Sequence, residues 1–470
     1  MMKLAPYPEY KDAGVSWVGS IPAHWPEKRA KYYFKEIDER SQTGDEEMLS
    51  VSHITGVTPR SQKNVSMFKA ESNVGQKRCQ PGDIVINTMW AWMSALGVSN
   101  DDGIVSPAYG VYRPRSNQDY DNYYLDHLLR IGKYRSEYIC RSTGIRSSRL
   151  RLYPDKFLRM RVACPPLDEQ KTIARFLKAQ DRLFRKFIRN KRRLIELLKE
   201  QKQNVINQAV TRGLDLEVRL KPSGVEWIGD IPVHWEVRKA KHLCEKIIDC
   251  KNRTPPDGKE DEYRVVRTSD VKDGKLINDE ITWTTEEGYK IWTQRGAPQV
   301  GDVFFTREAP CGEACIVPED MELCMGQRMM YFRPDSELLD KEYLLFSIYG
   351  PIVRDYISIN TNGSTVGHLR LGQVYSLPIA WCPVEEQKAI VTFIKYASVM
   401  IDAAITRAQR DIELIREYRT RLISDVVTGQ VDVRGIEVPD VAEHELLALV
   451  EDSKGADEII DDELEMEVEE

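Results

Sequence analysis

The chain has 470 residues, of which 41% are hydrophobic and 30% are charged, so it is long enough for roughly two to four domains with cores of their own. A single small module is excluded, and residues 84–98, the longest apolar-leaning stretch, fall short of the roughly 20 residues that cross a bilayer. The net charge of −7 hides an uneven distribution, because residues 436–470 hold 15 acidic residues and one lysine, which leaves residues 1–435 with a net charge of +7.

The N-terminal sequence MMKLAPYPEYKDAG has no apolar signal core, so a cytoplasmic protein is expected. Its nine cysteines are odd in number and scattered, which is typical of reduced thiols. The closest group, Cys311, Cys315 and Cys324, has neither CxxC spacing nor a nearby histidine, and no metal site is expected there.

A repeat runs through the whole chain. GVSWVGSIPAHW at residues 14–25 returns as GVEWIGDIPVHW at residues 224–235, with eight of twelve positions identical. PGDIV is echoed by VGDVF, YRP by FRP, STGIRSSRLRL by TNGSTVGHLRL with a shared LRL, PPLDEQ by CPVEEQ, and AVTRGLD by VVTGQVD, all in the same order. The sequence therefore predicts two copies of one structural unit.

Each copy begins with short apolar runs such as DIVIN and DVFFT, punctuated by Gly and Pro, which predict short strands in a mixed α/β, α+β domain. Each then continues into a segment without Gly or Pro, residues 167–210 and 384–427, which predicts a long helix. Residues 166–212 carry 13 Lys/Arg and five Asp/Glu, so a polyanion partner and a merely solvated helix face are both consistent with this charge.

Apolar residues recur along both helices in alternating steps of three and four, the seam of a coiled coil. Gln180, Lys191, Gln201 and Arg419 interrupt it. Because the first helix leads from one domain to the other, the second must run back to bury its stripe. This connectivity predicts two globular domains in a pseudo-two-fold relation, separated by two long helices forming an antiparallel coiled coil of about 60 Å. The alternative, in which each helix packs on a separate partner protein, stays open.

Signatures of catalysis are missing: the sequence has no GxxxxGK[ST] loop, GxGxxG, HExxH, GxSxG or paired CxxC. In the repeated IPxHW motif, Trp25 and Trp235 are expected in the core, while His24 and His234 cap or hydrogen-bond a nearby turn. The pairs Asp168–Glu169 and Glu385–Glu386 open the long helices, where carboxylates complement the helix dipole. We therefore predict no catalytic residues.

This tandem arrangement, with IPxHW at each start and P(L/V)xEQ at each helix entry, resembles the DNA-sequence specificity subunit of Type I restriction-modification systems over residues 14–432. The resemblance implies target recognition domains at residues 1–165 and 213–382 and spacer helices at residues 166–212 and 383–432. An acidic tail at residues 433–470 departs from the family and is expected to be disordered. By hypothesis, this tail competes with DNA for the basic helices.

The family resemblance also implies how such a chain works. Each recognition domain would read one half of a bipartite, asymmetric site on double-stranded DNA, and the helices would set the spacer and dock two modification subunits that methylate adenine N6. Restriction subunits would complete the nuclease. S-adenosylmethionine, ATP and Mg would lie on these partners, and no cofactor, metal or membrane is expected on the chain itself. The alternatives are a coiled-coil interaction scaffold and a stand-alone DNA-binding regulator.

For contact with DNA, polar and basic loop residues that differ between the copies are the candidates, since Arg suits guanine and Ser or Thr can position phosphates. Arg370, like Arg151, lies beside the repeated LRL and could be structural instead, and Trp90 and Trp92 are assigned to the core. The candidates are Ser61, Gln62, Lys63, Arg146, Ser147, Ser148 and Arg149 in the first copy, and Arg253, Thr254, Arg307, Thr365, His368 and Arg370 in the second.

Overall fold

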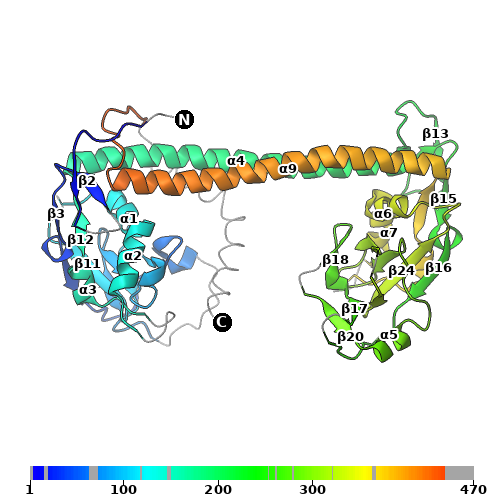
Figure 1. Ribbon diagram of the computed structural model, residues 1–470, viewed down its shortest axis with the longest axis horizontal. Helices are drawn as coiled ribbons and strands as arrows, with labels where there is room; N and C mark the ends of the chain where they lie inside the picture. Colours follow the sequence, from blue (N-terminus) through cyan, green and yellow to red (C-terminus); the bar gives the residue numbers. More distant parts are fainter. Residues whose placement is uncertain are drawn as a thin grey trace. The chain divides into compact units, whose positions relative to one another are not determined.

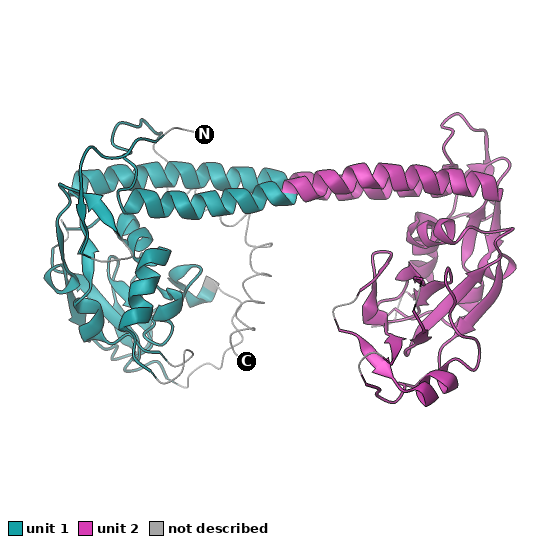
Figure 2. Ribbon diagram, in the orientation of Figure 1, with its two compact units in different colours: residues 1–192, 409–470 teal, residues 193–408 magenta. Residues whose placement is uncertain are grey.

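The structure, a computed structural model, divides the chain into two compact units, which are described separately (Figure 2). Unit 1 comprises residues 1–192 and 409–470, and unit 2 comprises residues 193–408. The described residues are 4–14, 19–62, 72–116, 119–144, 150–251, 253–259, 262–277, 280–319, 321–361 and 367–439.

Unit 1 is built on short strands, as the Gly- and Pro-punctuated apolar runs predict. Its central sheet has four antiparallel strands in the order β4-β11-β8-β9, and the pairs β1-β2, β3-β12, β5-β6 and β7-β10 surround it. The strands are β1 Tyr10–Asp12, β2 Ser20–Pro22, β3 Glu27–Arg29, β4 Phe34–Ile37, β5 Leu49–Ser52, β6 Gly56–Pro59, β7 Lys77–Cys79, β8 Ile84–Ile86, β9 Leu96–Val98, β10 Gly103–Val105, β11 Gly110–Pro114 and β12 Arg161–Ala163.

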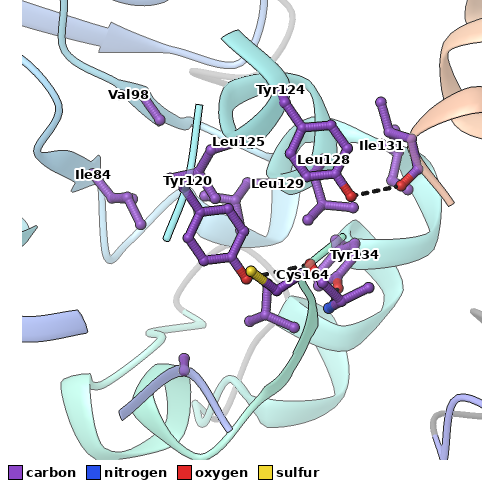
Figure 3. Close-up of a cluster of buried hydrophobic side chains, with 14 of the residues drawn as sticks. Ile84, Val98, Tyr120, Tyr124, Leu125, Leu128, Leu129, Ile131, Tyr134 and Cys164 are labelled. Carbon is purple, nitrogen blue, oxygen red and sulfur yellow. Dashed lines mark hydrogen bonds between the residues drawn. The ribbon is translucent and has the colours of Figure 1, made fainter. Parts of the chain in front are cut away.

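Three short helices cover this sheet: α1 (Asn122–Arg130), α2 (Gly132–Arg141) and α3 (Pro154–Leu158). Figure 3 shows the buried side chains of α1, Tyr124, Leu125, Leu128 and Leu129, packed with Tyr120 and Tyr134. The Tyr124 hydroxyl donates to the carbonyl oxygen of Val427 at 3.0 Å, which attaches α1 to the end of the second long helix.

Unit 2 repeats the central sheet with the order β16-β24-β21-β22. Beside it lie a three-stranded sheet, β20-β17-β23, and the pairs β13-β14, β15-β25 and β18-β19. The strands are β13 Leu220–Pro222, β14 Asp230–Pro232, β15 Glu236–Lys239, β16 Cys244–Asp249, β17 Tyr263–Val266, β18 Val271–Lys272, β19 Lys275–Leu276, β20 Thr282–Thr284, β21 Val303–Thr306, β22 Ala314–Ile316, β23 Leu323–Met325, β24 Met329–Pro334 and β25 Pro378–Trp381. The helices are α5 Glu286–Trp292, α6 Lys341–Tyr349, α7 Pro351–Thr361 and α8 Leu371–Tyr375.

The two predicted long helices are confirmed as α4 (Leu167–Arg212) and α9 (Val384–Val427), and each contributes to both units (Figures 1 and 2). In unit 1, Asp181 pairs with Arg419 at 2.7 Å and Lys191 with Asp411 at 2.9 Å. In unit 2, Lys202 pairs with Asp402 at 2.7 Å. Partner numbers fall along α9 as they rise along α4, so the helices pair antiparallel within each unit. This confirms the mixed α+β class and the coiled coil, while the pseudo-two-fold relation stays a prediction.

The ends of the long helices enter the domain cores. In unit 1 the start of α4, through Ile173 and Leu177, packs with the end of α9, through Leu422 and Val426. In unit 2 the end of α4, through Ile206, Ala209 and Val210, packs in the same core as Ile390 and Ile394 of α9. Each domain is therefore fixed to both helices by buried apolar contacts.

Helix α9 includes an 18-residue window that is apolar enough, by length and composition alone, to cross a membrane, and 22% of that window is buried. Residues 84–98 are therefore not the longest apolar stretch of the chain. A single such helix is weak evidence of a membrane span, and α9 carries Asp402 and Asp411, which pair with lysines of α4.

Candidate nucleic-acid interface

The histidine and tryptophan of the first IPxHW motif bind a carboxylate in the first turn of α4. The Trp25 indole Nε1 donates to Glu169 Oε1 at 3.1 Å, and His24 Nε2 lies 2.9 Å from Oε2. The Tyr7 hydroxyl donates to the same Oε1 at 2.6 Å, and the Glu169 side chain is only 6% exposed. Burial and this carboxylate together raise the pKa of Tyr7. Glu169 therefore anchors the domain to the helix, in addition to complementing the helix dipole.

The second copy repeats this contact. The Trp235 indole Nε1 donates to Glu386 Oε1 at 3.1 Å, and His234 Nε2 lies 2.9 Å from Oε2. Both tryptophans are fully buried, which confirms the prediction for them. The predicted contact of each histidine with a turn is wrong, because a helix carboxylate within reach offers the imidazole a stronger, charge-assisted partner.

The glutamine of each xEQ motif fixes the loop before a short helix. Gln170 Nε2 donates to the carbonyl oxygens of Pro165 and Asp119, both at 2.8 Å, while its Oε1 accepts the N–H of Asp121 at 2.9 Å. Asp121 in turn caps α1 by accepting the N–H of Tyr124. Gln170 thus joins the start of α4 to the start of α1.

In unit 2, Gln387 makes the same set of bonds. Its Nε2 donates to the carbonyl oxygens of Cys382 at 2.7 Å and Leu338 at 3.0 Å, and its Oε1 accepts the N–H of Asp340, the cap of α6. Both glutamines are fully buried and fully bonded, which explains why the motif is repeated.

The repeated GD and RP dipeptides form a buried ion pair across the central sheet. Arg113 donates to both carboxylate oxygens of Asp83 at 2.8 and 2.9 Å, and Arg333 does the same to Asp302 at 2.8 Å. The aspartates are buried. Because the repeated residues are occupied by partners within their own unit, they belong to the scaffold, and candidates for DNA contact must lie in the loops that differ.

In unit 2 the sheet topology brings several such loops to one edge. Strands β16 and β21 end, and β24 begins, at the same edge of the sheet, because β24 runs antiparallel to both. Figure 1 shows β16 and β24 side by side. The edge carries Asp249, Arg307, Glu308 and Arg328, and residue 308 bridges to His368.

The charged side chains at this edge are paired with one another. Arg307 lies 3.3 Å from Asp249, with side chains 6% and 11% exposed. Glu308 Oε2 lies 3.1 Å from both Arg328 Nη1 and His368 Nδ1. The Arg307 side chain is therefore buried and not available at the surface. In this conformation it stabilises the sheet edge through Asp249 and does not reach out towards a base.

The other candidates of unit 2 differ in their setting. His368 is half-buried at the same edge, and Arg370 is exposed in the residue before α8. Arg253 and Thr254 are exposed after the end of β16, where the Arg253 carbonyl oxygen accepts the Trp292 indole N–H at 3.2 Å. Thr365 lies outside the described residues. The structure thus brings Arg307 and His368 together, and contact with DNA stays a prediction for all of them.

In unit 1, most of the candidates fall outside the described residues: Lys63, Arg146, Ser147, Ser148 and Arg149. Ser61 is exposed in a 3-10 turn that ends at Gln62, and its N–H is bonded to Glu47 at 3.3 Å. Thr143 and Arg151, which lie on either side of residues 145–149, pair through both backbone N–H groups at 3.0 Å.

The structure shifts the alignment of the LRL motif by two residues. The N–H of Leu152 donates to the carbonyl oxygen of Thr88 at 2.9 Å, two residues after β8, and that of Leu369 donates to the carbonyl oxygen of Arg307 at 3.1 Å, directly after β21. Both leucines are buried, whereas Leu371 is exposed. Leu152 therefore corresponds to Leu369, and His368 to Arg151, because the preceding loops differ in length.

Sequence reasoning missed Glu308 and Arg328. Arg328 has a φ of 66°, a left-handed conformation that non-glycine residues adopt at turns, and no motif marked it. The assignment of Trp90 and Trp92 to the core is only partly correct, since both are half-buried around the buried Ala91.

Among the residues that the structure describes, no group of three or more His, Cys, Asp or Glu side chains could hold a metal ion. All nine cysteines are free thiols. Burial raises the pKa of Cys315 and Cys324 to about 12, so these thiols are poor nucleophiles and metal ligands at neutral pH.

Comparison with known proteins identifies relatives of the chain. Residues 232–413 match the family described as Type I restriction modification DNA specificity domain. Two curated proteins of Methanocaldococcus jannaschii are similar: the putative type I restriction enzyme MjaX specificity subunit is 26% identical over 328 residues, covering 68% of this chain and 71% of that protein. The type I restriction enzyme MjaVIII specificity subunit is 24% identical over 327 residues, covering 68% and 73%.

Two solved structures share the fold. One, from a study of complex assembly and conformational transition of the type I R-M system, has a TM-score of 0.63 at 16% identity and covers 87% of this chain and 99% of its own. The HsdS subunit from Thermoanaerobacter tengcongensis has a TM-score of 0.52 at 18% identity, covering 87% and 98%.

Proposed function

We propose that the chain is a DNA specificity subunit of a type I restriction-modification system, as its similarity to such subunits indicates, and that it reads a bipartite, asymmetric site on double-stranded DNA, one half-site per unit. The paired helices α4 and α9 set the number of unread base pairs. The chain directs adenine-N6 methylation and DNA cleavage that partner subunits perform, and contributes no catalytic residue itself.

The observation that carries this proposal is the duplicated scaffold. Both units hold a long helix through the same Glu–His–Trp contact. In both, the buried leucine after a non-repeated segment, Leu152 or Leu369, bonds to the chain just after the strand that follows the GD dipeptide. A common scaffold with different loops suits two readers of different sequences, since loop side chains at base edges carry specificity.

The length of the helices supports a spacer role. At about 1.5 Å per residue, the 46 residues of α4 extend about 69 Å. Its ends are buried in the domain cores, so the length between readers is shorter than this upper limit. The coiled-coil seam and the cross-helix ion pairs stiffen the pair, which a ruler requires.

Exposed apolar residues on the long helices support docking of partner subunits there. On α9, Phe393, Tyr396, Val399 and Met400 are 45%, 71%, 66% and 62% exposed. They recur at helical spacing, so they form one patch, and contiguous apolar patches mark interaction sites. We propose that two modification subunits bind the helices, and that restriction subunits join the resulting complex.

Mapping methylated adenines in the host genome by single-molecule sequencing tests the proposal. We expect one bipartite motif that disappears when the gene for the chain is deleted and returns with the intact gene. A monopartite motif would favour a stand-alone regulator acting near a methylase, and an unchanged map would favour a coiled-coil scaffold. Either result would contradict the proposal.

Changing the helix length tests the spacer role. Seven residues inserted into both α4 and α9, at the opposed positions 193 and 408, preserve the seam and add about 10 Å. At about 3.4 Å per base pair, the unread gap should widen by about three base pairs while both half-sites stay the same. An unchanged gap would exclude the helices as the ruler.

The Tyr396→Asp variant should lose the modification subunit on co-purification, whereas Lys388→Asp, on an exposed part of α9 outside the patch, should keep it.

A further inference from the structure

Unit 1 contains a cavity with a strongly basic lining. It has a volume of about 920 Å³ and lies between β3, α2, α3 and β12. Two acidic side chains, Glu137 and Asp155, reach it as well. The basic side chains in its lining are Arg29, Lys31, Arg141, Arg159 and Arg161.

The cations of this cavity are only partly neutralised within the chain. Arg141 forms an ion pair with Glu137, which also lines the cavity. Arg29 and Arg161 are direct cross-strand partners in the antiparallel pair β3-β12, an arrangement that destabilises a sheet because their like charges face the same side. Arg161 reaches Glu27 at 3.3 Å. Arg29 and Arg159 are exposed and form no ion pair with any residue that the structure describes. An anion bound in the cavity would relieve the repulsion between the like charges of Arg29 and Arg161.

Unit 2 does not carry the same charges. The strand pairing places Pro378 where unit 1 has Arg161, opposite Lys239. Buried Val353 and Ile357 of α7 correspond to Tyr134 and Tyr138 of α2. By the offset between these helices, neutral Tyr356 and Asn360 replace Glu137 and Arg141, and by the offset of the strand pairing Ser376 replaces Arg159. The basic cavity is therefore a feature of the first copy and not of the common scaffold.

The cavity borders both ends of the segment between α2 and α3, and four of the predicted DNA-contacting residues belong to the part of this segment that lies outside the described residues. Arg141, at the end of α2, and Asp155, at the start of α3, both line it. Between Arg141 and Asp155, the backbone bridge Thr143–Arg151 joins the two ends of this segment. A DNA strand read by this segment would pass its backbone close to the cavity.

We propose that the basic cavity of unit 1 binds backbone phosphates of the DNA that flanks the half-site read by this unit. This inference rests on the proposed function and extends it, because it assigns Arg29 and Arg159 as positioning residues that carry affinity without sequence preference. Guanidinium groups bind phosphate oxygens through two parallel N–H donors, and such contacts fix the register of a protein on the duplex. Unit 1 then binds the DNA around its half-site more tightly than unit 2 binds the DNA around the other half-site.

The test uses the full chain in complex with its modification subunit and duplexes that contain the mapped site. The variant Arg29→Ala/Arg159→Ala removes two exposed charges from the cavity. The control Lys11→Ala/Lys35→Ala removes two exposed charges from strands β1 and β4 of the same unit, outside both the cavity and the long helices. Affinity is measured as a function of salt concentration for the cognate duplex and for duplexes with changed half-sites.

We expect the cavity variant to reduce the slope of log affinity against log salt by about 1.8, which corresponds to about a sixtyfold loss at 0.1 M salt. Discrimination between cognate and changed duplexes should stay the same. Replacing the phosphates that flank the unit 1 half-site by neutral methylphosphonates should weaken the wild-type complex and leave the cavity variant unaffected.

A slope that falls equally in the control, or a cavity variant that loses discrimination, would overturn the inference. Failure of the proposed function looks different, because wild-type protein would then bind all duplexes alike. In that case the salt slope would still test whether the cavity binds phosphates, since phosphate contacts do not depend on the DNA sequence.

Discussion

Removing the carboxylate that anchors each domain to its long helix should destabilise the two units by different amounts. In unit 1, Glu169→Ala leaves the buried Trp25 indole N–H and the buried Tyr7 hydroxyl without their acceptor. A buried donor without a partner costs about 1–3 kcal/mol. We therefore expect a loss of about 4 kcal/mol in the free energy of unfolding of unit 1.

In unit 2, the matched change Glu386→Ala removes less. The Glu386 side chain is 30% exposed, and the Trp235 indole N–H also lies 3.1 Å from His234 Nε2, so water and the imidazole can replace the carboxylate. We expect a loss of about 1–2 kcal/mol. The difference between the variants tests whether burial, and not the motif itself, sets the energy.

Hydrogen exchange followed by mass spectrometry reports the two units separately, which a single unfolding curve of a two-unit chain does not. Peptides around residues 19–29 and the first turns of α4 should lose protection strongly in Glu169→Ala, and peptides around residues 230–239 weakly in Glu386→Ala. Equal losses, or a larger loss in unit 2, would refute the reasoning. Glu169→Gln, which retains an acceptor oxygen, should recover part of the loss.

Three further results are expected. Burial lowers the pKa of His127 to about 4. The positive charges of Arg130 and Arg419 also lower this pKa, whereas Asp126 at 3.9 Å and Asp181 raise it. Because the histidine of the unfolded chain titrates near 6.5, the free energy of unfolding of unit 1 should fall by about 2 kcal/mol as the pH falls from 7 to 4.5. His127→Gln should abolish most of this loss in urea unfolding. Asp181→Ala, which strands Arg185 and Arg419 at the helix pair, should cost unit 1 about 2–3 kcal/mol, whereas Asp402→Ala, at the exposed pair with Lys202, should cost less than about 1 kcal/mol; similar losses would disprove the role of burial. Deleting residues 440–470 should raise DNA affinity at low salt if the acidic tail competes for the basic helices, and unchanged affinity would exclude that competition.

The repeat made most of the architecture predictable. Two Gly- and Pro-free segments with a regular apolar stripe, residues 167–210 and 384–427, predicted the long helices, which span Leu167–Arg212 and Val384–Val427. Periodicity over about forty residues averages out local exceptions. Single motifs were harder to interpret. Glu169 and Glu386 looked like helix-capping residues, since their partners His24 and His234 lie about 150 residues away and no local pattern links them.

The candidate site was less predictable, because charge and polarity alone do not distinguish an exposed arginine from a buried one. Arg307 was selected as a loop cation, but the turn after β21 directs it towards Asp249 in the interior. Arg29 and Arg161 were not selected, since nothing in the sequence places them opposite each other until strands β3 and β12 pair.

Exchanging a single recognition domain tests the central claim most directly. Residues 14–160 are replaced by the corresponding segment of a relative with a different target, and methylated adenines are mapped in cells that carry the chimera. Independent readers predict a hybrid motif in which one half-site changes while the other half-site and the gap are retained. A chimera that alters both half-sites would contradict the division of the chain into two readers.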